Sequence, residues 1–243
     1  MIDLAKFYEQ GLIPGPQEDA TSFLKRVETA SALNRQNLSP VTQELFGFSI
    51  EWVPVFFSNK KLLPWEGAAI WISEGEIPHI QLRKHFFKTQ LFQKDQGEFL
   101  AHESVHAARL LFEEPQFEEI LAYQTSKNCF RRFWGPLFRS SKESSLFMAI
   151  FAGVLFCGWF FPWIIYLLPL SMLGYFIFRL MRNQHIFSKC LKKTSLPFML
   201  CLTDAEIILF SKLSPQEIAA YLDKQEGIRS KLSILLFSGR FRR

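Results

Sequence analysis

The sequence predicts an α+β protein that carries a membrane hairpin, and three observations lead to this fold class. In the first half of the chain, short runs of aromatic and β-branched residues lie between helical patterns. Residues 146–178 then form a block of 33 residues without a charged side chain. Two sequence patterns typical of helix N-termini follow the block. We therefore expect a first domain over residues 1–130, a transmembrane hairpin over residues 146–180 and a C-terminal cytoplasmic helical segment over residues 195–243.

The first half of the chain begins with a helix and a small sheet. The stretch Pro16–Leu33 has helical spacing of its apolar residues, with prolines at its start. Residues 47–57 are rich in aromatic and β-branched residues and predict a strand, which Pro54 restricts to an edge or an end. Two more short strands, Ala68–Ser73 and Ile77–Leu82, are joined by a Glu-Gly-Glu hairpin signal.

Two helices are expected after the sheet. Asp95 and Glu98 have the spacing of a capping box, which predicts the start of a helix. Pro115 stops this helix, because a proline disfavours helical backbone in the residue before it. The same proline suits the first turn of a following helix, from Gln116 to about Asn128.

The charge-free block is too long for one upright membrane helix of about 20 residues and slightly short for two. A tight hairpin fits better, because Pro162 and Pro169 interrupt the block. Trp159, Trp163 and Tyr166 lie in its middle, where a hairpin places them at an interface and a single span would not. Basic residues flank both ends, so both ends and both termini are expected in the cytoplasm. The alternative is a buried helix pair in the core of a soluble protein.

Charge and cysteine content exclude some classes of function. The net charge of +5 combines −6 over residues 1–126 (11 Lys/Arg, 17 Asp/Glu) with +11 over residues 127–243 (17 Lys/Arg, 6 Asp/Glu). The basic surplus beside the apolar block fits the surface of an anionic lipid bilayer. No nucleic-acid-binding motif is recognisable, so no nucleic-acid partner is expected. The four scattered cysteines are typical of reduced thiols and not of a thiolate metal site.

Beyond the hairpin, two helices begin with Ser or Thr followed by acidic residues. Thr203-Asp204-Ala205-Glu206 opens the first, and Ser214-Pro215-Gln216-Glu217 opens the second. Both patterns are typical of capped helix starts.

The motif that carries chemistry is His102-Glu103-Ser104-Val105-His106, within the helix that follows the sheet. Positions four apart project from one face of a helix, so both imidazoles can point at one metal ion. The carboxylate of Glu103 lies beside the first of them and can act as a general base. A zinc ion would lower the pKa of a bound water to about 7. The motif therefore predicts a site for one Zn²⁺ ion. A chance pair of histidines on a surface helix is the alternative.

A catalytic zinc site needs a third protein ligand. The next helix carries Glu118 and Glu119, and a turn at Pro115 would fold it back toward the histidines. The two glutamates point about 100° apart, so only one of them can easily face the metal. From the residues alone the choice stays open, and either can also be a solvated acid in the first turn of a helix.

The runs Ala101–Arg109 and Phe117–Tyr123 together resemble the gluzincin metallopeptidases, especially the small minigluzincins. The resemblance covers about residues 65–127 and implies a zincin-like domain. Aligning Ala122 with the family alanine implies that Glu119 is the third ligand. Tyr123 stands where the family usually has Asp or Asn. The resemblance also implies that an edge strand, Ala68–Ser73, binds an extended peptide substrate.

These patterns favour a zinc-dependent endopeptidase at the cytoplasmic membrane surface, acting on peptide or protein substrates. The main alternative is a metal-binding but non-hydrolytic scaffold or sensor of peptidase ancestry. A third interpretation is a structural membrane protein with a chance motif. Tyr123, His185 and Arg109 are candidates for stabilising an oxyanion, although Arg109 is better placed along its helix to pair with Glu113.

Overall fold

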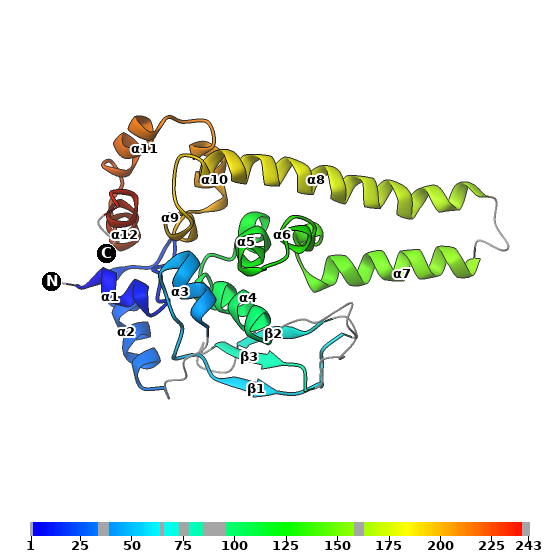
Figure 1. Cartoon of the computed structure of the whole chain (residues 1–243), viewed down its shortest axis with the longest axis horizontal. Helices are drawn as coiled ribbons and strands as arrows, with labels where there is room; N and C mark the ends of the chain where they lie inside the picture. Colours follow the sequence, from blue (N-terminus) through cyan, green and yellow to red (C-terminus); the bar gives the residue numbers. More distant parts are fainter. Residues whose placement is uncertain are drawn as a thin grey trace.

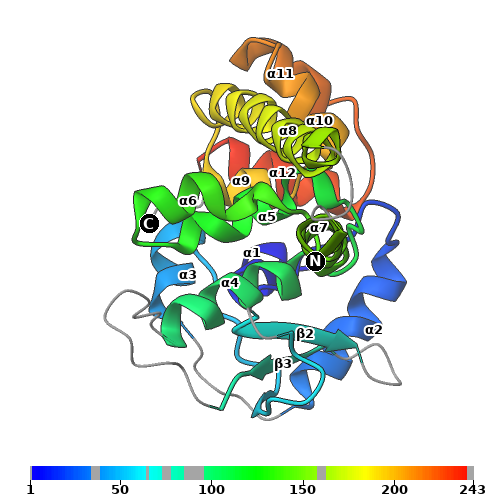
Figure 2. The same ribbon diagram turned by 90° about the vertical axis from the view of Figure 1, so that its right-hand side faces the viewer.

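A three-stranded sheet and a series of helices make up the protein, seen in a computed structural model (Figure 1). The structure describes residues 2–33, 39–63, 66–72, 78–84, 96–157 and 163–239. The mixed fold predicted from the sequence is confirmed at this level, with helices in excess over strands. In both views the layers run from the sheet to α4, then to α5 and α6, and then to α8 (Figures 1 and 2).

The sheet has the strand order β1-β3-β2, with bounds Val55–Phe57 (β1), Ala68–Ile72 (β2) and Pro78–Leu82 (β3). β1 runs parallel to β3, and β2 runs antiparallel to β3 with Ile70 opposite Ile80. The predicted pairing of the last two strands is confirmed, while their turn lies outside the described residues. Residues 47–57 are a strand only at their end. Phe48 and Ile50 are fully buried in the core instead, which accounts for the apolar pattern.

Before the sheet, the part of the chain that the structure describes forms the helices α1 (Leu4–Glu9), α2 (Ala20–Ser31) and α3 (Pro40–Phe46). α2 lies within the helix predicted from the sequence. It starts at Ala20 because the side chain of Asp19 accepts a hydrogen bond from the backbone N–H of Ser22 at 2.7 Å. α1 and α3 are short and were not predicted. The buried hydroxyl of Tyr8 ties them together by donating to the carbonyl of Phe46 at 2.6 Å.

The motif helix is α4 (Gln96–Ala108), and α5 (Pro115–Ala122) follows it. The predicted cap, Asp95, lies outside the described residues. α5 starts at Pro115 as predicted but ends earlier than Asn128, in a 3-10 turn over Tyr123–Thr125. Asn128 instead caps the next helix through its side chain. That helix is α6 (Cys129–Trp134), and a second 3-10 turn, Gly135–Leu137, follows it.

The apolar block folds as two helices side by side, α7 (Ser141–Cys157) and α8 (Leu167–Leu191), the second preceded by a 3-10 turn at Trp163–Tyr166 (Figure 1). The carboxylate of Glu143 and the guanidinium of Arg179 join the two helices at 2.6 Å. Trp163–Leu191 is long and apolar enough to cross a membrane. α7 passes the same test only together with the preceding segment, from which it is bent by 76°. The cytoplasmic placement of both ends stays a prediction.

Beyond the hairpin, the described residues form the helices α9 (Leu196–Leu200), α10 (Asp204–Phe210), α11 (Pro215–Leu222) and α12 (Ile228–Phe237). The predicted N-termini of α10 and α11 are both confirmed. Thr203 with Glu206 and Ser214 with Glu217 form reciprocal capping boxes. α9 and α12 were not predicted. The core is continuous across the hairpin, so the segments on its two sides pack on each other.

Arg109 connects the end of α4 to the chain beyond the hairpin. Its side chain is fully buried, and its Nη1 donates to the carbonyl oxygens of Leu200 at 2.7 Å and Leu202 at 3.0 Å. The guanidinium also lies 4.3 Å from the ring centroid of Phe112. Hydrogen bonds from a charged donor to buried carbonyls are among the stronger ones in proteins. The end of the motif helix is therefore fixed to a segment almost a hundred residues further along the chain.

The first turn of α5 is fixed to the same segment. The carboxylate of Asp204 accepts hydrogen bonds from the backbone N–H groups of Gln116 at 2.9 Å and Phe117 at 3.2 Å. In return, the backbone N–H of Asp204 donates to the carboxylate of Glu114. Asp204 thus satisfies two N–H groups at the start of α5 that no helical carbonyl reaches. Both helices of the motif region are held in place by residues 200–204.

Replacing Arg109 by Met should destabilise the protein by about 1–3 kcal/mol, because the carbonyls of Leu200 and Leu202 lose a buried donor. Chemical unfolding of the detergent-solubilised protein measures this change. Lys224→Met is the matched control, since Lys224 is exposed and such surface changes stay within about 0.5 kcal/mol. Equal stability of the two variants would contradict the role given to Arg109.

Candidate metal centre

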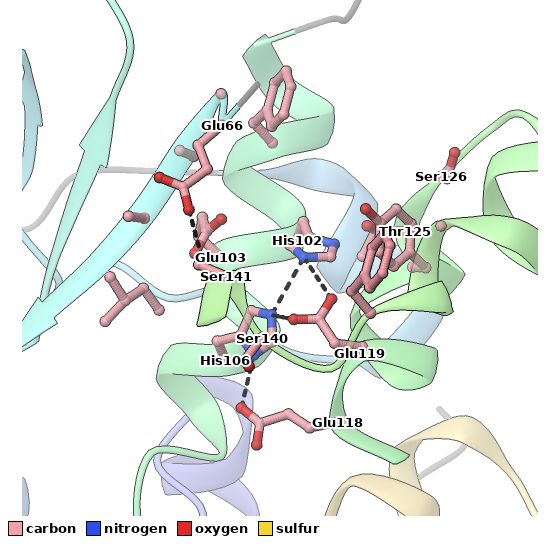
Figure 3. Close-up of a pocket in the computed structure, with 18 of the residues that line it drawn as sticks. Glu66, His102, Glu103, His106, Glu118, Glu119, Thr125, Ser126, Ser140 and Ser141 are labelled. Atoms are coloured by element: carbon pink, nitrogen blue, oxygen red, sulfur yellow. Dashed lines mark hydrogen bonds and ion pairs between the residues drawn. The ribbon is translucent and has the colours of Figure 1, made fainter. Parts of the chain in front are cut away.

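α4 and α5 bring three side chains of metal-binding chemistry to one point (Figure 3). The Nε2 atoms of His102 and His106 lie 3.3 Å apart. Each of these nitrogens is 3.5 Å from an oxygen of the Glu119 carboxylate. The ligand atoms of the three residues all lie within 4.8 Å of one another. The cluster predicted from the sequence is therefore assembled, and it can hold a metal ion.

The spacing of the two imidazole nitrogens fits a tetrahedral ion. Zinc–nitrogen and zinc–oxygen bonds of about 2.0–2.2 Å place neighbouring ligand atoms about 3.3–3.6 Å apart at a tetrahedral angle. The 3.3 Å between the two Nε2 atoms agrees with that edge length. Glu119 places a different oxygen 3.5 Å from each nitrogen, Oε2 beside His102 and Oε1 beside His106. Two imidazoles and one carboxylate also suit several other divalent ions, so the donor set leaves the identity of the metal open.

The two adjacent glutamates of α5 have different positions, as their angular separation predicts. Glu119 reaches between the two imidazoles, whereas Glu118 lies beyond His106 (Figure 3). One carboxylate oxygen of Glu118 accepts a hydrogen bond from Nδ1 of His106 at 2.7 Å. This contact leaves the other ring nitrogen, Nε2, directed at Glu119. A carboxylate in this position fixes the tautomer and the orientation of a ligand histidine.

The carboxylates around His106 favour a positive charge on its imidazole. Burial opposes protonation of the imidazole, but the carboxylates of Glu119 and Glu118 outweigh it and raise the pKa of His106 to about 10. Burial likewise opposes ionisation of Glu119, yet the two imidazoles lower the pKa of its carboxyl. A metal cation would take the place of the proton on His106, so metal binding should release protons.

Glu103 lies beside the cluster, on the turn of α4 that carries His102. Its side chain lines the cleft in front of the cluster, yet the residue is only 8 % exposed. Burial raises the pKa of the Glu103 carboxyl, against the opposing pull of the His102 and His106 imidazoles. A carboxylate with a raised pKa is a stronger base, which suits proton transfer near neutral pH.

Tyr123 contacts His102 through its ring. The two ring centroids are 4.6 Å apart and the planes are nearly perpendicular. Gly135 also lies against the tyrosine: a Cβ atom there would come within 2.2 Å of the ring, so only glycine fits. Where the gluzincin pattern has an Asp or Asn, this chain thus packs an aromatic ring against the histidine.

The cluster opens into a cleft of about 650 Å³ between β2, α4, α5 and the start of α7. Several polar residues that the sequence did not assign to the site also line the cleft: Glu66, Glu98, Arg131 and Ser141. Arg131 pairs with Glu98 at 2.9 Å, and the hydroxyl of Ser141 donates to the carboxylate of Glu66. These residues come from distant parts of the chain, and no local pattern marks them as neighbours.

The other residues that the sequence suggested for the site lie outside the metal cluster. Arg109 is buried away from the cleft and contacts carbonyls instead of Glu113, so the expected ion pair is not formed. Glu113 lines the cleft outside the cluster, and His185 is exposed on α8. Of the three candidates for stabilising an oxyanion, Tyr123 alone is among the residues that line the cleft.

Comparison with known proteins gives no match to this chain among family models, curated proteins or solved structures. The chemistry of the site is therefore argued from its own residues.

Single replacements of three glutamates near the site should separate their roles in metal binding. Glu119→Ala removes a ligand atom and should weaken zinc affinity the most. Glu118→Ala should weaken it by about 10–100-fold, the usual cost of losing the partner of a ligand histidine. Glu113→Ala is the control and should leave affinity unchanged. Competition with a chromophoric chelator measures all three, and equal affinities of Glu119→Ala and Glu113→Ala would contradict the assignment.

Proposed function

We propose that this protein is a membrane-anchored zinc-dependent metalloendopeptidase. The observation that carries the proposal is the meeting of His102, His106 and Glu119, whose ligand atoms lie within 4.8 Å of one another, with the buried carboxyl of Glu103 beside them in a cleft. The resemblance of the motif region to gluzincin metallopeptidases points the same way. His102, His106 and Glu119 would hold one Zn²⁺ ion.

The proposed reaction is the hydrolysis of a peptide bond. A zinc ion bound here would supply the Lewis acidity that activates water near neutral pH. Glu103 would take a proton from the attacking water and pass it to the nitrogen of the leaving amine. Glu118 would hold His106 in one orientation throughout, through the hydrogen bond at Nδ1.

Two features of the cleft support a polypeptide substrate. β2 is an edge strand of the described sheet, and its residues Ala68, Ala69 and Ile70 line the cleft. An extended peptide can add to such an edge through backbone hydrogen bonds. Burial, together with Glu119, raises the pKa of Tyr123 to about 12, so its hydroxyl keeps its proton. Tyr123 would donate that proton in a hydrogen bond to the developing oxyanion.

The hairpin supports action at a membrane surface. The start of α7 forms part of the wall of the cleft, so the site and the apolar helices are adjacent. Substrates would be membrane-proximal segments or small proteins that reach this surface. The alternative function, a metal-binding scaffold or sensor without hydrolysis, would have no chemical need for the carboxyl of Glu103.

Glu103→Gln should lower the rate of peptide hydrolysis by about 10²–10⁴-fold, because the amide cannot act as a general base. Zinc content should be retained, since Glu103 is not among the three clustered ligands. Cleavage of an unfolded protein by the zinc-loaded, detergent-solubilised chain measures the rate, with exposed Glu44→Gln as control. Unchanged cleavage in Glu103→Gln would refute the role of Glu103. A wild-type chain that binds zinc but cleaves nothing would favour the scaffold or sensor.

A further inference from the structure

The six-residue helix α6 exposes three large aromatic side chains. Phe130 is 66 % exposed, Phe133 38 % and Trp134 36 %. Their rings contact one another, with centroids 5.3 Å apart between Phe133 and Trp134 and 6.3 Å apart between Phe130 and Trp134. An exposed aromatic cluster of this kind marks a surface that binds another apolar phase. Neither the metal centre nor the hairpin explains it.

The direction of α6 suits a surface-bound helix. The segment Cys129–Leu137 is bent by 76° from α7. In Figure 1 the hairpin runs lengthwise and α6 is seen almost end-on, whereas Figure 2 looks along the hairpin and shows α6 lying across the view. If α7 enters the membrane along its normal, α6 lies close to the membrane plane.

Two hydrogen bonds to α8, one made by α6 and one by the 3-10 turn that follows it, fix the position of this segment along the hairpin. Arg179 donates to the carbonyl of Leu137 at 3.3 Å, and Gln184 donates to the carbonyl of Phe133 at 3.2 Å. At 1.5 Å per residue these contacts span about 7.5 Å of α8. The charge-free block ends at Phe178, just before them. The headgroup layer of a bilayer is about 5–8 Å thick on each side, so α6 lies at its level.

The charges at this level agree with an anionic lipid surface. Lys127, Arg132, Lys142 and Arg182 are all exposed. Exposed Lys and Arg beside a membrane helix are attracted to anionic headgroups by about 1 kcal/mol each. Aromatic side chains are enriched at the same depth, where their rings meet both water and hydrocarbon.

We propose that α6 lies in the lipid–water interface of an anionic leaflet, with Phe130, Phe133 and Trp134 at the boundary of the acyl chains and Arg132 among the phosphates. This contact places the metal centre against the bilayer, because Arg131 of the same helix pairs with Glu98 in the first turn of α4. The inference does not depend on peptide hydrolysis.

Spin labels on single cysteines test the proposal in the full chain. The exposed Cys129 and the partly exposed Cys157 are first replaced by Ser, while the buried Cys190 and Cys201 stay in place. Phe130→Cys and Phe133→Cys then carry a nitroxide on α6. Leu170→Cys, exposed on α8, is the reference for lipid, and exposed Lys224→Cys is the reference for water.

Collision rates with oxygen, which concentrates in lipid, and with a water-soluble nickel chelate are measured in phosphatidylcholine bilayers with and without phosphatidylglycerol. The ratio of the oxygen collision rate to the nickel collision rate for labels at 130 and 133 should fall between the ratios for the reference labels at 170 and 224. The ratio should be higher, which indicates a deeper label, when phosphatidylglycerol is present. Adding Arg132→Gln should reduce that difference.

Three results would overturn the proposal. Labels at 130 and 133 that behave like the label at 224 would place α6 in water. Labels shielded from both reagents would indicate a protein partner instead of lipid. A label at 170 that behaves as aqueous would remove the membrane on which the orientation of α6 depends.

Discussion

The candidate metal centre depends on how residues 200–204 hold the ends of two helices. Arg109 at the end of α4 donates to the carbonyls of Leu200 and Leu202, and Asp204 accepts from the first N–H groups of α5. The angle between α4 and α5 determines whether Glu119 on α5 reaches the two histidines on α4. A segment that follows the hairpin in sequence therefore sets the geometry of a site that precedes it.

This arrangement joins the candidate site to the apolar helices. α8 contacts α5 directly, since the side-chain amide of Gln116 donates to Asn183 at 3.2 Å. On the other side of the cleft, Ser141 at the start of α7 contacts Glu66 beside β2. The ends of both hairpin helices thus support walls of the same cleft. The elements that position the candidate ligands therefore also position the two apolar helices.

The sequence predicted those parts of the protein that local rules determine. The four-residue spacing of His102 and His106, the proline at the start of α5 and the two capping boxes each depend on a few neighbouring residues, and all are present. The short helices α1, α3, α9 and α12 were missed because tertiary packing, and not a long apolar pattern, stabilises them. The position of Glu118 and the polar residues of the cleft depend on contacts between distant segments, which one sequence does not encode locally.

The central claim is that two imidazoles and one carboxylate bind a single zinc ion. X-ray absorption at the zinc edge of the loaded protein tests it most directly. The account predicts two imidazole nitrogens and at least one oxygen at about 2.0–2.2 Å, with the protein-carboxylate contribution lost when Glu119 is replaced by Ala. A sulfur neighbour at about 2.3 Å, or a zinc spectrum without imidazole scattering, would contradict it.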